Sequence, residues 1–303
     1  MGPLERTWRP DHPLDLPLIL GRLRRGPADP TTDWHAGTWW RASRTPAGLA
    51  TLNLAARPAL GEVHARAWGD GATWALDQLP ALLGAHDNPD DLTLPPGPLR
   101  EAQRRHPGLR LGATGLVTES LIAAILEQKV TVREAHRAYA TLVRAYGIPA
   151  PGPHSDLRVA PAARDWARIP SWDWHKAGVD PKRADTIQRA VRLAPRLEQA
   201  AAMTSAEAFA RLTTVPGIGH WTAAETLQRS NGDPDAVSVG DFHLKNAVGM
   251  ALAGRPRSTD EEMLELLAPY QGHRHRVCRL ITLTGARPPR FGPRLAPEDH
   301  RRR

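Results

Sequence analysis

Residues 212–254 contain the residue types and the spacing that best suit chemistry on a phosphate-bearing ligand. The run 215–219 reads VPGIG, in which proline ends one helix while the glycines permit positive φ and let a backbone approach a ligand closely. A second helix is expected to begin near His220, and the unpaired N–H groups at its start would form a site for phosphate. Taken by itself, the run also suits an ordinary turn between two helices.

Asp241 follows this turn by about twenty residues, within the run 238–244, SVGDFHL. It stands where a further helix is expected to begin, so it is predicted to cap that helix. The helix dipole favours a negative charge at such a position. A carboxylate placed in this way can also face a cationic transition state, so the two roles are compatible and Asp241 is the candidate catalytic residue.

The turn, the spacing and the acidic residue occur together, and in this combination the sequence resembles the helix-hairpin-helix DNA glycosylase superfamily. The hairpin of that superfamily reads PGIG or PGVG and is followed by an aspartate at this spacing. Within it, the chain is most similar to the bacterial 3-methyladenine DNA glycosylase II group, whose hairpin is close to the run PGIGHWTA at 216–223. Further similarity lies at 8–10, 121–132, 182–184 and 273–274, and the resemblance is strongest from 118 to 253.

The resemblance implies an α+β fold with two parts. One is a mostly α-helical helix-hairpin-helix glycosylase core made of two helical subdomains, and the other is an N-terminal α+β domain like the TATA-binding protein. The implied domains are residues 1–92 for the α+β domain, 93–111 and 236–285 for the helical subdomain that carries Asp241, 112–235 for the subdomain with the hairpin, and 286–303 for a basic flexible tail.

The implied reaction is hydrolysis of the N-glycosidic bond of a damaged nucleotide, which the enzyme rotates out of the duplex into a pocket. Asp241 would stabilise the oxocarbenium-like sugar and would orient or deprotonate the attacking water. Trp221, Phe242 and Glu225 stand at base-pocket positions, and aromatic faces attract the positive charge of alkylated purines such as 3-methyladenine and 7-methylguanine. The alternative for Trp221 is a core aromatic on the hairpin helix, and the alternative for Glu225 is an exposed glutamate on a helix surface.

Trp221 also bears on the mechanism, because members that cut the DNA backbone carry a lysine here, which attacks the sugar and forms a Schiff base. Tryptophan cannot do this. The sequence therefore predicts a monofunctional enzyme of the DNA-3-methyladenine glycosylase II type, which leaves an abasic site in base excision repair and has no lyase activity. The alternatives are a glycosylase for deaminated or oxidised bases and a non-catalytic protein that binds damaged DNA.

Contacts with DNA are predicted at the hairpin and at two other segments: Gly217, Ile218, Gly219, His220, Thr222, Gln128, Lys129 and Lys245. Lys129 stands where the resembled group inserts an apolar wedge into the base stack, so either its aliphatic stem, with Gln128 beside it, or another residue would enter the stack. No cofactor is expected to be required. The resemblance implies a structural Na⁺ or K⁺ ion bound by the backbone carbonyls of Thr213, Val215 and Ile218.

Two other features of the sequence exclude or disfavour further chemistry. Cys278 is the single cysteine, so neither an internal disulfide nor a cysteine-ligated cluster can form. His273 and His275 form an HxH pair without a third ligand beside it, so we expect a solvated or DNA-facing position for them and no metal site.

Strands and short helices are expected in about the first ninety residues, and helices alone after Pro98. Alternation of residue types predicts strands over 38–44, 48–57 and 62–68, with helical faces at 14–25 and 74–83. Polar and proline-rich residues over 86–98 indicate a linker. Helical periodicity predicts helices over 98–106, 118–128, 131–146, 161–168, 181–200, 205–212, 220–230, 242–253, 258–267 and 271–284, with N-caps at Thr118, Thr131, Ser205 and Ser258.

The composition is consistent with a DNA partner. The chain has 303 residues and a formal net charge of +8, and lysine occurs only at 129, 176, 182 and 245, so most of the 40 basic residues are arginines. Arginine binds phosphate oxygens in pairs, although genome base composition explains the bias equally well. The expected partner is double-stranded DNA containing damaged bases. The longest aliphatic run, 121–126, is too short to span a membrane, and we expect a monomer in the bacterial cytoplasm, associated with the nucleoid.

Overall fold

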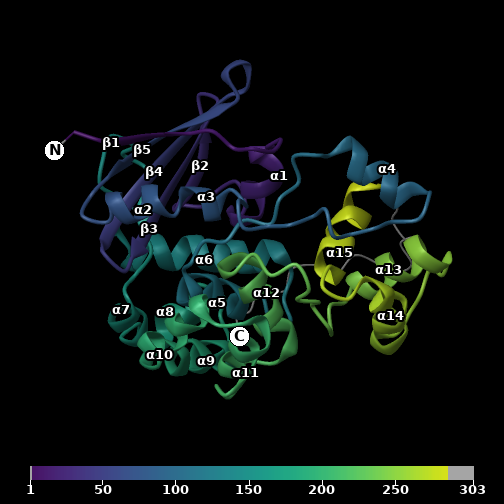
Figure 1. Cartoon of the computed structure of the whole chain (residues 1–303). Coiled ribbons are helices and arrows are strands. Elements are labelled where there is room, and N and C mark those ends of the chain that lie inside the picture. Colours follow the sequence, from purple (N-terminus) through teal and green to yellow (C-terminus); the bar gives the residue numbers. More distant parts are fainter. Residues whose placement is uncertain (1, 286–303) are drawn as a thin grey trace.

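The structure is a computed structural model that describes residues 2–285. The predicted basic tail at 286–303 lies outside the described residues. Figure 1 shows three units: a sheet with short helices, a large helical unit below it, and a smaller helical unit beside both. Within the described part of the chain, no helix is long and apolar enough to cross a membrane.

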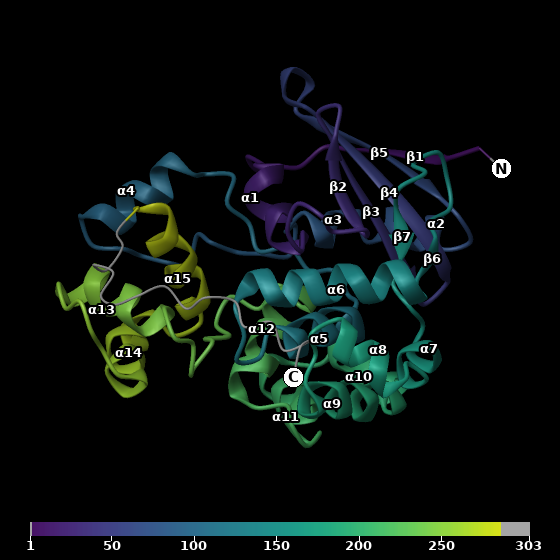
Figure 2. The same ribbon diagram turned by 180° about the vertical axis from the view of Figure 1, so that it is seen from behind.

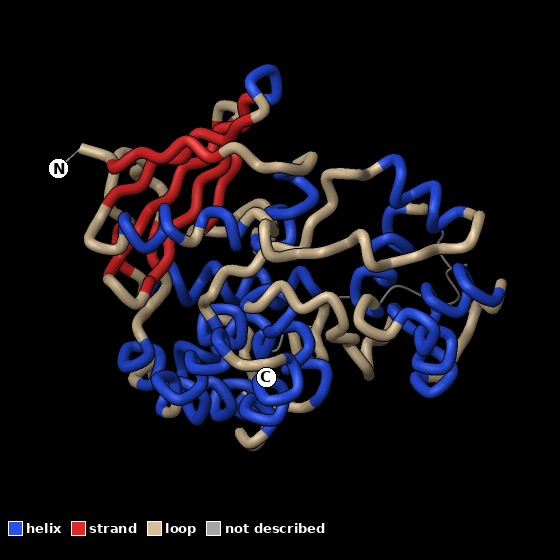
Figure 3. The backbone as a smooth tube through the Cα atoms, in the orientation of Figure 1, coloured by secondary structure: helices blue, strands red, loops and turns tan. Residues whose placement is uncertain are grey.

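A five-stranded antiparallel sheet, drawn red in Figure 3, forms the first unit. The sequence predicted its three central strands and missed the two edge strands, β1 and β2. An edge strand buries few side chains, and β1 is exposed or half-buried throughout, so its hydrophobic alternation is weak. The strands are β1 (Leu4–Trp8), β2 (Thr32–His35), β3 (Thr38–Thr45), β4 (Gly48–Arg57) and β5 (Glu62–Trp68), in the spatial order β1-β5-β4-β3-β2, and the helices are α1 (Leu16–Leu20), η1 (Gly21–Leu23), η2 (Pro58–Leu60), α2 (Ala72–Asp77) and α3 (Leu79–Leu82).

Successive side chains of β3 bury on opposite faces of this sheet. Trp39 lies in the core with residues of α1, α2 and α3. Trp40 lies on the other face, where its ring stacks on Trp68 at a centroid distance of 5.5 Å and packs with Val159. Val159 belongs to a short strand pair, β6 (Ile148–Pro149) with β7 (Arg158–Val159). The prediction of helices alone after Pro98 is wrong at this pair, which is too short to show a sequence period and depends on packing against the sheet.

The second unit surrounds one buried helix, α5. Nearly every side chain of α5 is buried, because α6, α9, α10 and α12 pack around it. A helix that is apolar on all sides is expected to lie inside its unit. Figure 2 shows α6 running between this unit and the sheet. The elements are α5 (Val117–Leu126), α6 (Val132–Tyr146), α7 (Ala163–Ala167), α8 (Ser171–Lys176), α9 (Pro181–Arg192), α10 (Ala194–Glu198), η3 (Gln199–Ala202), α11 (Ser205–Thr213) and α12 (His220–Ser230).

The third unit combines a segment from before the second unit with the segment after it. Leu99 of α4 shares a core with Val277 of α15. Residues 86–98, predicted to be a linker, belong to this core, because Leu92 and Leu94 are buried in it. Two isolated leucines among polar residues and prolines carry no periodic signal, which explains the wrong prediction. The elements are α4 (Pro98–Arg105), α13 (Leu244–Ala253), α14 (Asp260–Leu267), η4 (Ala268–Tyr270) and α15 (Arg274–Leu283).

Several helix boundaries differ from the prediction by a few residues. The predicted cap Thr131 is confirmed, since its hydroxyl accepts the backbone N–H of Glu134 at 3.3 Å. The helix predicted over 181–200 ends at Arg192, because Pro195 lacks the N–H that would continue it and instead stands in the first turn of α10. The neighbouring residues Thr204 and Thr259 take the capping role predicted for Ser205 and Ser258, and Thr118 lies inside α5.

Candidate active site

The predicted hairpin joins α11 to α12 through residues 214–219. Ile218 donates its backbone N–H to the carbonyl of Val215 at 3.0 Å, which closes the turn. Gly217 has a φ of +97°, and a side chain there would collide with Thr186 on α9. Gly219 precedes α12 without a side-chain cap, and the space beside its Cα is open. The first N–H groups of α12 are therefore accessible to a ligand.

The two glycines of the hairpin should respond differently to alanine. Gly217→Ala meets both an unfavourable φ and the Thr186 side chain, so we expect a loss of about 2 kcal/mol in the free energy of unfolding. Gly219 has a φ of −95°, which any residue adopts, so Gly219→Ala should change stability by less than about 0.5 kcal/mol and weaken only DNA binding. Urea unfolding and titration with abasic-site DNA measure both effects. Equal destabilisation by the two variants would contradict this assignment.

Asp241 lies in the loop between α12 and α13, where three N–H groups hold its carboxylate. Oδ1 accepts the backbone N–H groups of His243 at 2.8 Å and Leu244 at 2.9 Å. Oδ2 accepts the indole Nε1–H of Trp221 at 3.1 Å. Helix α13 begins at Leu244 and not at the predicted residue 242, so Asp241 caps it from just outside. The carboxylate is thus oriented by groups from both helical units.

The two predicted pocket aromatics occupy different environments. Trp221 is half-buried and directly contacts Asp241. Phe242 is 77% exposed, and its ring meets that of His243 at a centroid distance of 5.0 Å. The structure therefore joins Trp221 to the candidate catalytic carboxylate and leaves the Phe242 ring at the surface beside it.

Glu225, the third predicted pocket residue, is held in an internal ion pair. Its Oε2 accepts Nη1–H of Arg229 at 2.5 Å, and its Oε1 accepts the hydroxyl of Ser238. Burial by itself would raise the pKa of Glu225, but the guanidinium groups of Arg229 and Arg22 and the Ser238 hydroxyl lower it to about 2. The exposed-helix alternative for Glu225 is therefore wrong, because this turn of α12 faces inward. Its charge is already neutralised by Arg229.

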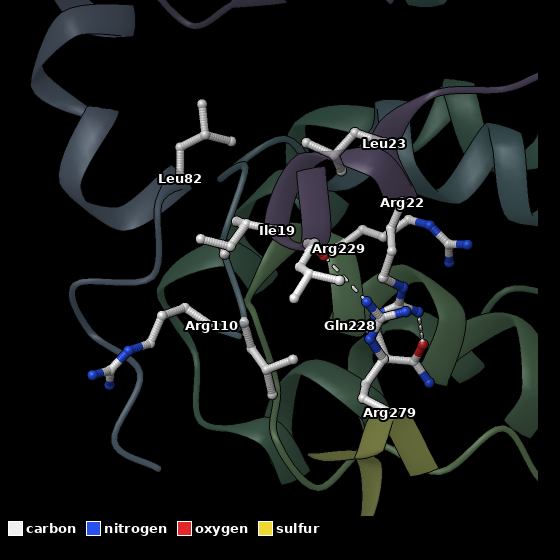
Figure 4. Close-up of a pocket in the computed structure, with 11 residues that line it drawn as sticks. Ile19, Arg22, Leu23, Leu82, Arg110, Gln228, Arg229 and Arg279 are labelled. Carbon is white, nitrogen blue, oxygen red and sulfur yellow. Dashed lines mark hydrogen bonds between the residues drawn. The ribbon is translucent and has the colours of Figure 1, made fainter. Parts of the chain in front are cut away.

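Arg22 of η1 reaches the same place from the first unit. Its guanidinium donates to Oε1 of Gln228 at 2.6 Å and to Nε2 of His275 at 2.8 Å. Figure 4 shows the side chains of Arg22 and Arg279 converging beside Gln228, at a small cavity. Sequence reasoning missed these residues, because an arginine on a short helix carries no signal of a partner in another unit.

His275 is 4% exposed, so the expected solvated or DNA-facing position is wrong for this member of the HxH pair, whereas His273 is half-buried. Its Nε2 must be unprotonated to accept the hydrogen bond from Arg22. Burial, together with the charges of Arg22 and Arg279, holds the pKa of His275 well below 6.5. Below pH 6.5, His275 therefore binds a proton in the unfolded chain but not in the folded protein. Its effect on the free energy of unfolding is absent above pH 6.5, and this free energy decreases as the pH falls below that value.

Replacing His275 by glutamine should reduce this acid sensitivity. Wild type should lose up to about 1.4 kcal/mol of unfolding free energy per pH unit for this group below its ordinary pKa. His275→Gln should show a flatter dependence, because glutamine can still accept from Arg22 and does not titrate. Urea unfolding at pH 7.5, 6.5 and 5.5 measures the slope, with His273→Gln as the matched control, since the pKa of His273 is lowered less. An unchanged slope in His275→Gln would show that another group is responsible.

The segment after α5 lies against the hairpin. Gln128 donates from Nε2 to the carbonyl of Gly217 at 3.0 Å and to the hydroxyl of Thr222 at 2.8 Å. The next residue, Lys129, is exposed and has a φ of +54°, which residues other than glycine rarely adopt. Strain of this kind is often found at functional positions. The assignment of Lys129 to the wedge position stays a prediction that this geometry supports.

The other residues predicted to contact DNA differ in which of their groups could meet a phosphate. The side chains of Ile218 and Thr222 are buried, so their backbone groups are what a phosphate could meet. The ring of His220 lies 4.6 Å from that of Phe209. The ammonium group of Lys245 pairs with Asp260 at 3.4 Å. These assignments also stay predictions.

The predicted cation ligands lie at the end of α11. Thr213 is the last residue of α11, and carbonyls at a helix C-terminus lack intrahelical partners and carry the negative end of the dipole. The Val215 carbonyl accepts one N–H, from Ile218, and a carbonyl has a second lone pair. The Na⁺ or K⁺ site at these carbonyls stays a prediction. Among the described residues, no group of three or more His, Cys, Asp and Glu side chains could hold a metal ion.

Comparison with known sequences finds a partial match. No family model matches the chain. A curated relative is the probable bifunctional transcriptional activator/DNA repair enzyme AlkA of Mycobacterium tuberculosis, which is 33% identical over 152 residues. The match covers 49% of this chain and about 30% of the length of that protein.

Solved structures share the fold over almost the whole chain. The 3-methyladenine DNA-glycosylase from Archaeoglobus fulgidus has a TM-score of 0.77 at 18% identity, and the match covers 92% of this chain and 98% of that one. The 8-oxoguanine glycosylase/lyase of Clostridium acetobutylicum has a TM-score of 0.71 at 11% identity, over 94% and 99%. The chain shares the fold of these two proteins. This confirms the predicted α+β fold class, and the match to AlkA agrees with the predicted resemblance.

Within this glycosylase fold, the candidate site lies where the second and third units meet. The hairpin and Trp221 belong to the second unit, whereas Asp241 comes from the loop that enters the third. The sequence identified these residues, but it did not reveal that the first unit also reaches the neighbourhood of the site through Arg22.

Proposed function

We propose that this protein is a hydrolytic DNA glycosylase that removes a damaged base from double-stranded DNA. The observation that carries the proposal is the 3.1 Å hydrogen bond from Trp221 to Asp241, near the accessible N-terminus of α12. It joins an aromatic ring and an oriented carboxylate to a phosphate-binding turn. The names of the similar proteins, a DNA repair enzyme and two DNA glycosylases, support it.

The residues divide the reaction among themselves. The first N–H groups of α12 bind a phosphate of the damaged strand while the nucleotide is turned out of the stack. The bond between C1′ and the base nitrogen breaks, its electron pair leaves with the base, and positive charge develops on the sugar. Asp241 stabilises this charge and accepts a proton from the water whose oxygen bonds to C1′. The product is an abasic site.

Trp221 supports a monofunctional mechanism. It occupies the position at which a lyase would carry its nucleophilic lysine, and an indole forms no Schiff base with the sugar. The fold alone does not decide this point, because the Clostridium acetobutylicum protein is named a glycosylase/lyase.

Alkylated purines such as 3-methyladenine and 7-methylguanine are the first candidate substrates. The face of Trp221 would attract a cationic base by about 0.5–2 kcal/mol. Such a base is already a good leaving group, so a single carboxylate suffices. The name of the Archaeoglobus fulgidus glycosylase agrees with this choice.

An oxidised or deaminated base is the second candidate substrate. The charged side chains around Glu225, on the helix that carries Trp221, favour it. Glu225 is neutralised by Arg229, while Arg22 and Arg279 add positive charge nearby. This surrounding would oppose a cationic base. The name of the Clostridium acetobutylicum 8-oxoguanine glycosylase/lyase agrees with this choice.

A panel of damaged DNA duplexes tests the proposal. Mass spectrometry should detect a free base released from methylated DNA or from duplexes containing hypoxanthine or 8-oxoguanine, and borohydride should trap no covalent protein–DNA adduct. Binding of abasic-site DNA without release of any base would mean that the protein only recognises damage. A trapped adduct would contradict the monofunctional mechanism.

A further inference from the structure

We propose that Arg22 and Gln228 position the loop that carries Asp241, so that the first unit takes part in base excision through a chain of hydrogen bonds. This inference rests on the function proposed above. The loop in question, residues 231–243, joins α12 to α13. Neither Arg22 nor Gln228 touches the reacting atoms in this account, so both are positioning residues.

Gln228 holds the loop directly. It is 4% exposed, and its Nε2 donates to the carbonyl of Ala236 at 2.8 Å and to the hydroxyl of Ser238 at 2.9 Å. The carbonyl of Ser238 accepts the backbone N–H of Asp241 at 3.1 Å. Both amide hydrogens of Gln228 are thus used on the part of the loop that leads into the candidate catalytic residue.

Arg22 decides which way the Gln228 amide faces. A guanidinium group can only donate, so the amide oxygen must turn toward Arg22 and the amide nitrogen toward the loop. With Arg22 removed, only the hydrogen bonds to Ala236 and Ser238 hold the amide in this orientation, and its oxygen loses its donor. The contact between Arg22 and the amide therefore acts on the loop and not merely on the junction of the units.

The rest of the network leaves Gln228 no competing partner. Ser238 uses its hydroxyl hydrogen on Glu225, and Glu225 is fixed by Arg229. His275 takes the second donor of Arg22 and comes from α15 of the third unit. All three units therefore meet at Arg22, and these buried hydrogen bonds between the units restrict the geometry of the loop.

Gln228→Glu separates loop positioning from simple docking of the units. A glutamate keeps and strengthens the contact with Arg22, but it has no hydrogen to donate to Ala236 or Ser238. If the network only docked the units, this variant would excise bases at the wild-type rate. We expect instead a fall of about 10- to 100-fold in the single-turnover excision rate, with affinity for abasic-site DNA within about twofold of wild type.

Variants of Arg22 supply the complementary test. Arg22→Met should slow single-turnover excision to a similar extent, and Arg22→Lys, which still only donates, should restore part of the rate. Arg41→Met is the matched control, because Arg41 of β3 pairs with Glu119 of α5 and links the same two units away from the loop. It should retain the wild-type rate even if it lowers Tm as much as Arg22→Met.

Hydrogen–deuterium exchange makes the test independent of the substrate. Amides over 236–244 should exchange faster in Gln228→Glu and Arg22→Met than in wild type or Arg41→Met. Unchanged exchange there, or a wild-type excision rate in Gln228→Glu, would overturn the inference. If wild type releases no base from any lesion, the proposed function fails, whereas the exchange contrast still decides whether the network positions the loop.

Discussion

Asp241→Asn should lower the single-turnover rate of base release by about 10³-fold or more while leaving DNA binding intact. Asparagine keeps an oxygen that can accept from the backbone N–H groups of His243 and Leu244, so the start of α13 should remain capped. It loses the negative charge that would face the sugar, and its amide NH₂ would oppose the indole N–H of Trp221. The effect therefore falls on catalysis and not on folding.

The matched control for this substitution is Asp15→Asn. Asp15 also caps a helix, α1, by accepting the backbone N–H of Leu18 at 3.0 Å, but it lies in the first unit. It should excise bases at the wild-type rate. Rates are measured with enzyme in excess over lesion-bearing duplex, and binding is measured with abasic-site DNA. A rate within tenfold of wild type for Asp241→Asn would remove Asp241 from the catalytic role.

Arg276→Leu should cost about 3–5 kcal/mol of unfolding free energy. The side chains of Arg276 and Asp87 are each 2% exposed, and two guanidinium nitrogens pair with the two carboxylate oxygens. Removing the arginine leaves a buried carboxylate whose remaining hydrogen bond comes from the backbone N–H of Leu111 at 2.9 Å. Water cannot replace the missing partner without opening the core.

A double-mutant cycle checks the cause of this loss. Adding Asp87→Asn to Arg276→Leu should recover stability, because the uncompensated charge is then gone while an oxygen remains for Leu111. Urea unfolding at pH 7.5 measures each variant, and Arg274→Leu serves as a comparison, since Arg274 pairs with Asp235 at a more exposed place. A cost for Arg276→Leu near that of Arg274→Leu would show that the buried pair contributes little.

Local chemistry made much of the candidate site predictable. Proline and glycine at 216–219 mark the hairpin because their backbone preferences act within a few residues, and α12 begins and ends as predicted. Residue type and spacing made Asp241 a candidate, and Trp221 became one through the resemblance to the glycosylase family. Helical periodicity predicted the long amphipathic helices. It did not reveal the edge strand β1 or the pair β6–β7, because strands this short depend on packing with distant residues.

Residue types and spacing therefore determined the fold class, the hairpin turn and the candidate carboxylate. Only the tertiary structure decided which charges are compensated and by what. The sequence allowed Glu225 to be either an exposed residue or a pocket residue. The structure shows its carboxylate bound internally by Arg229 and Ser238. Arg22 and Gln228 lie 206 positions apart, and Arg276 and Asp87 lie 189 apart. A buried polar group needs a partner but can take it from anywhere in the chain, so no local pattern specifies the pairing.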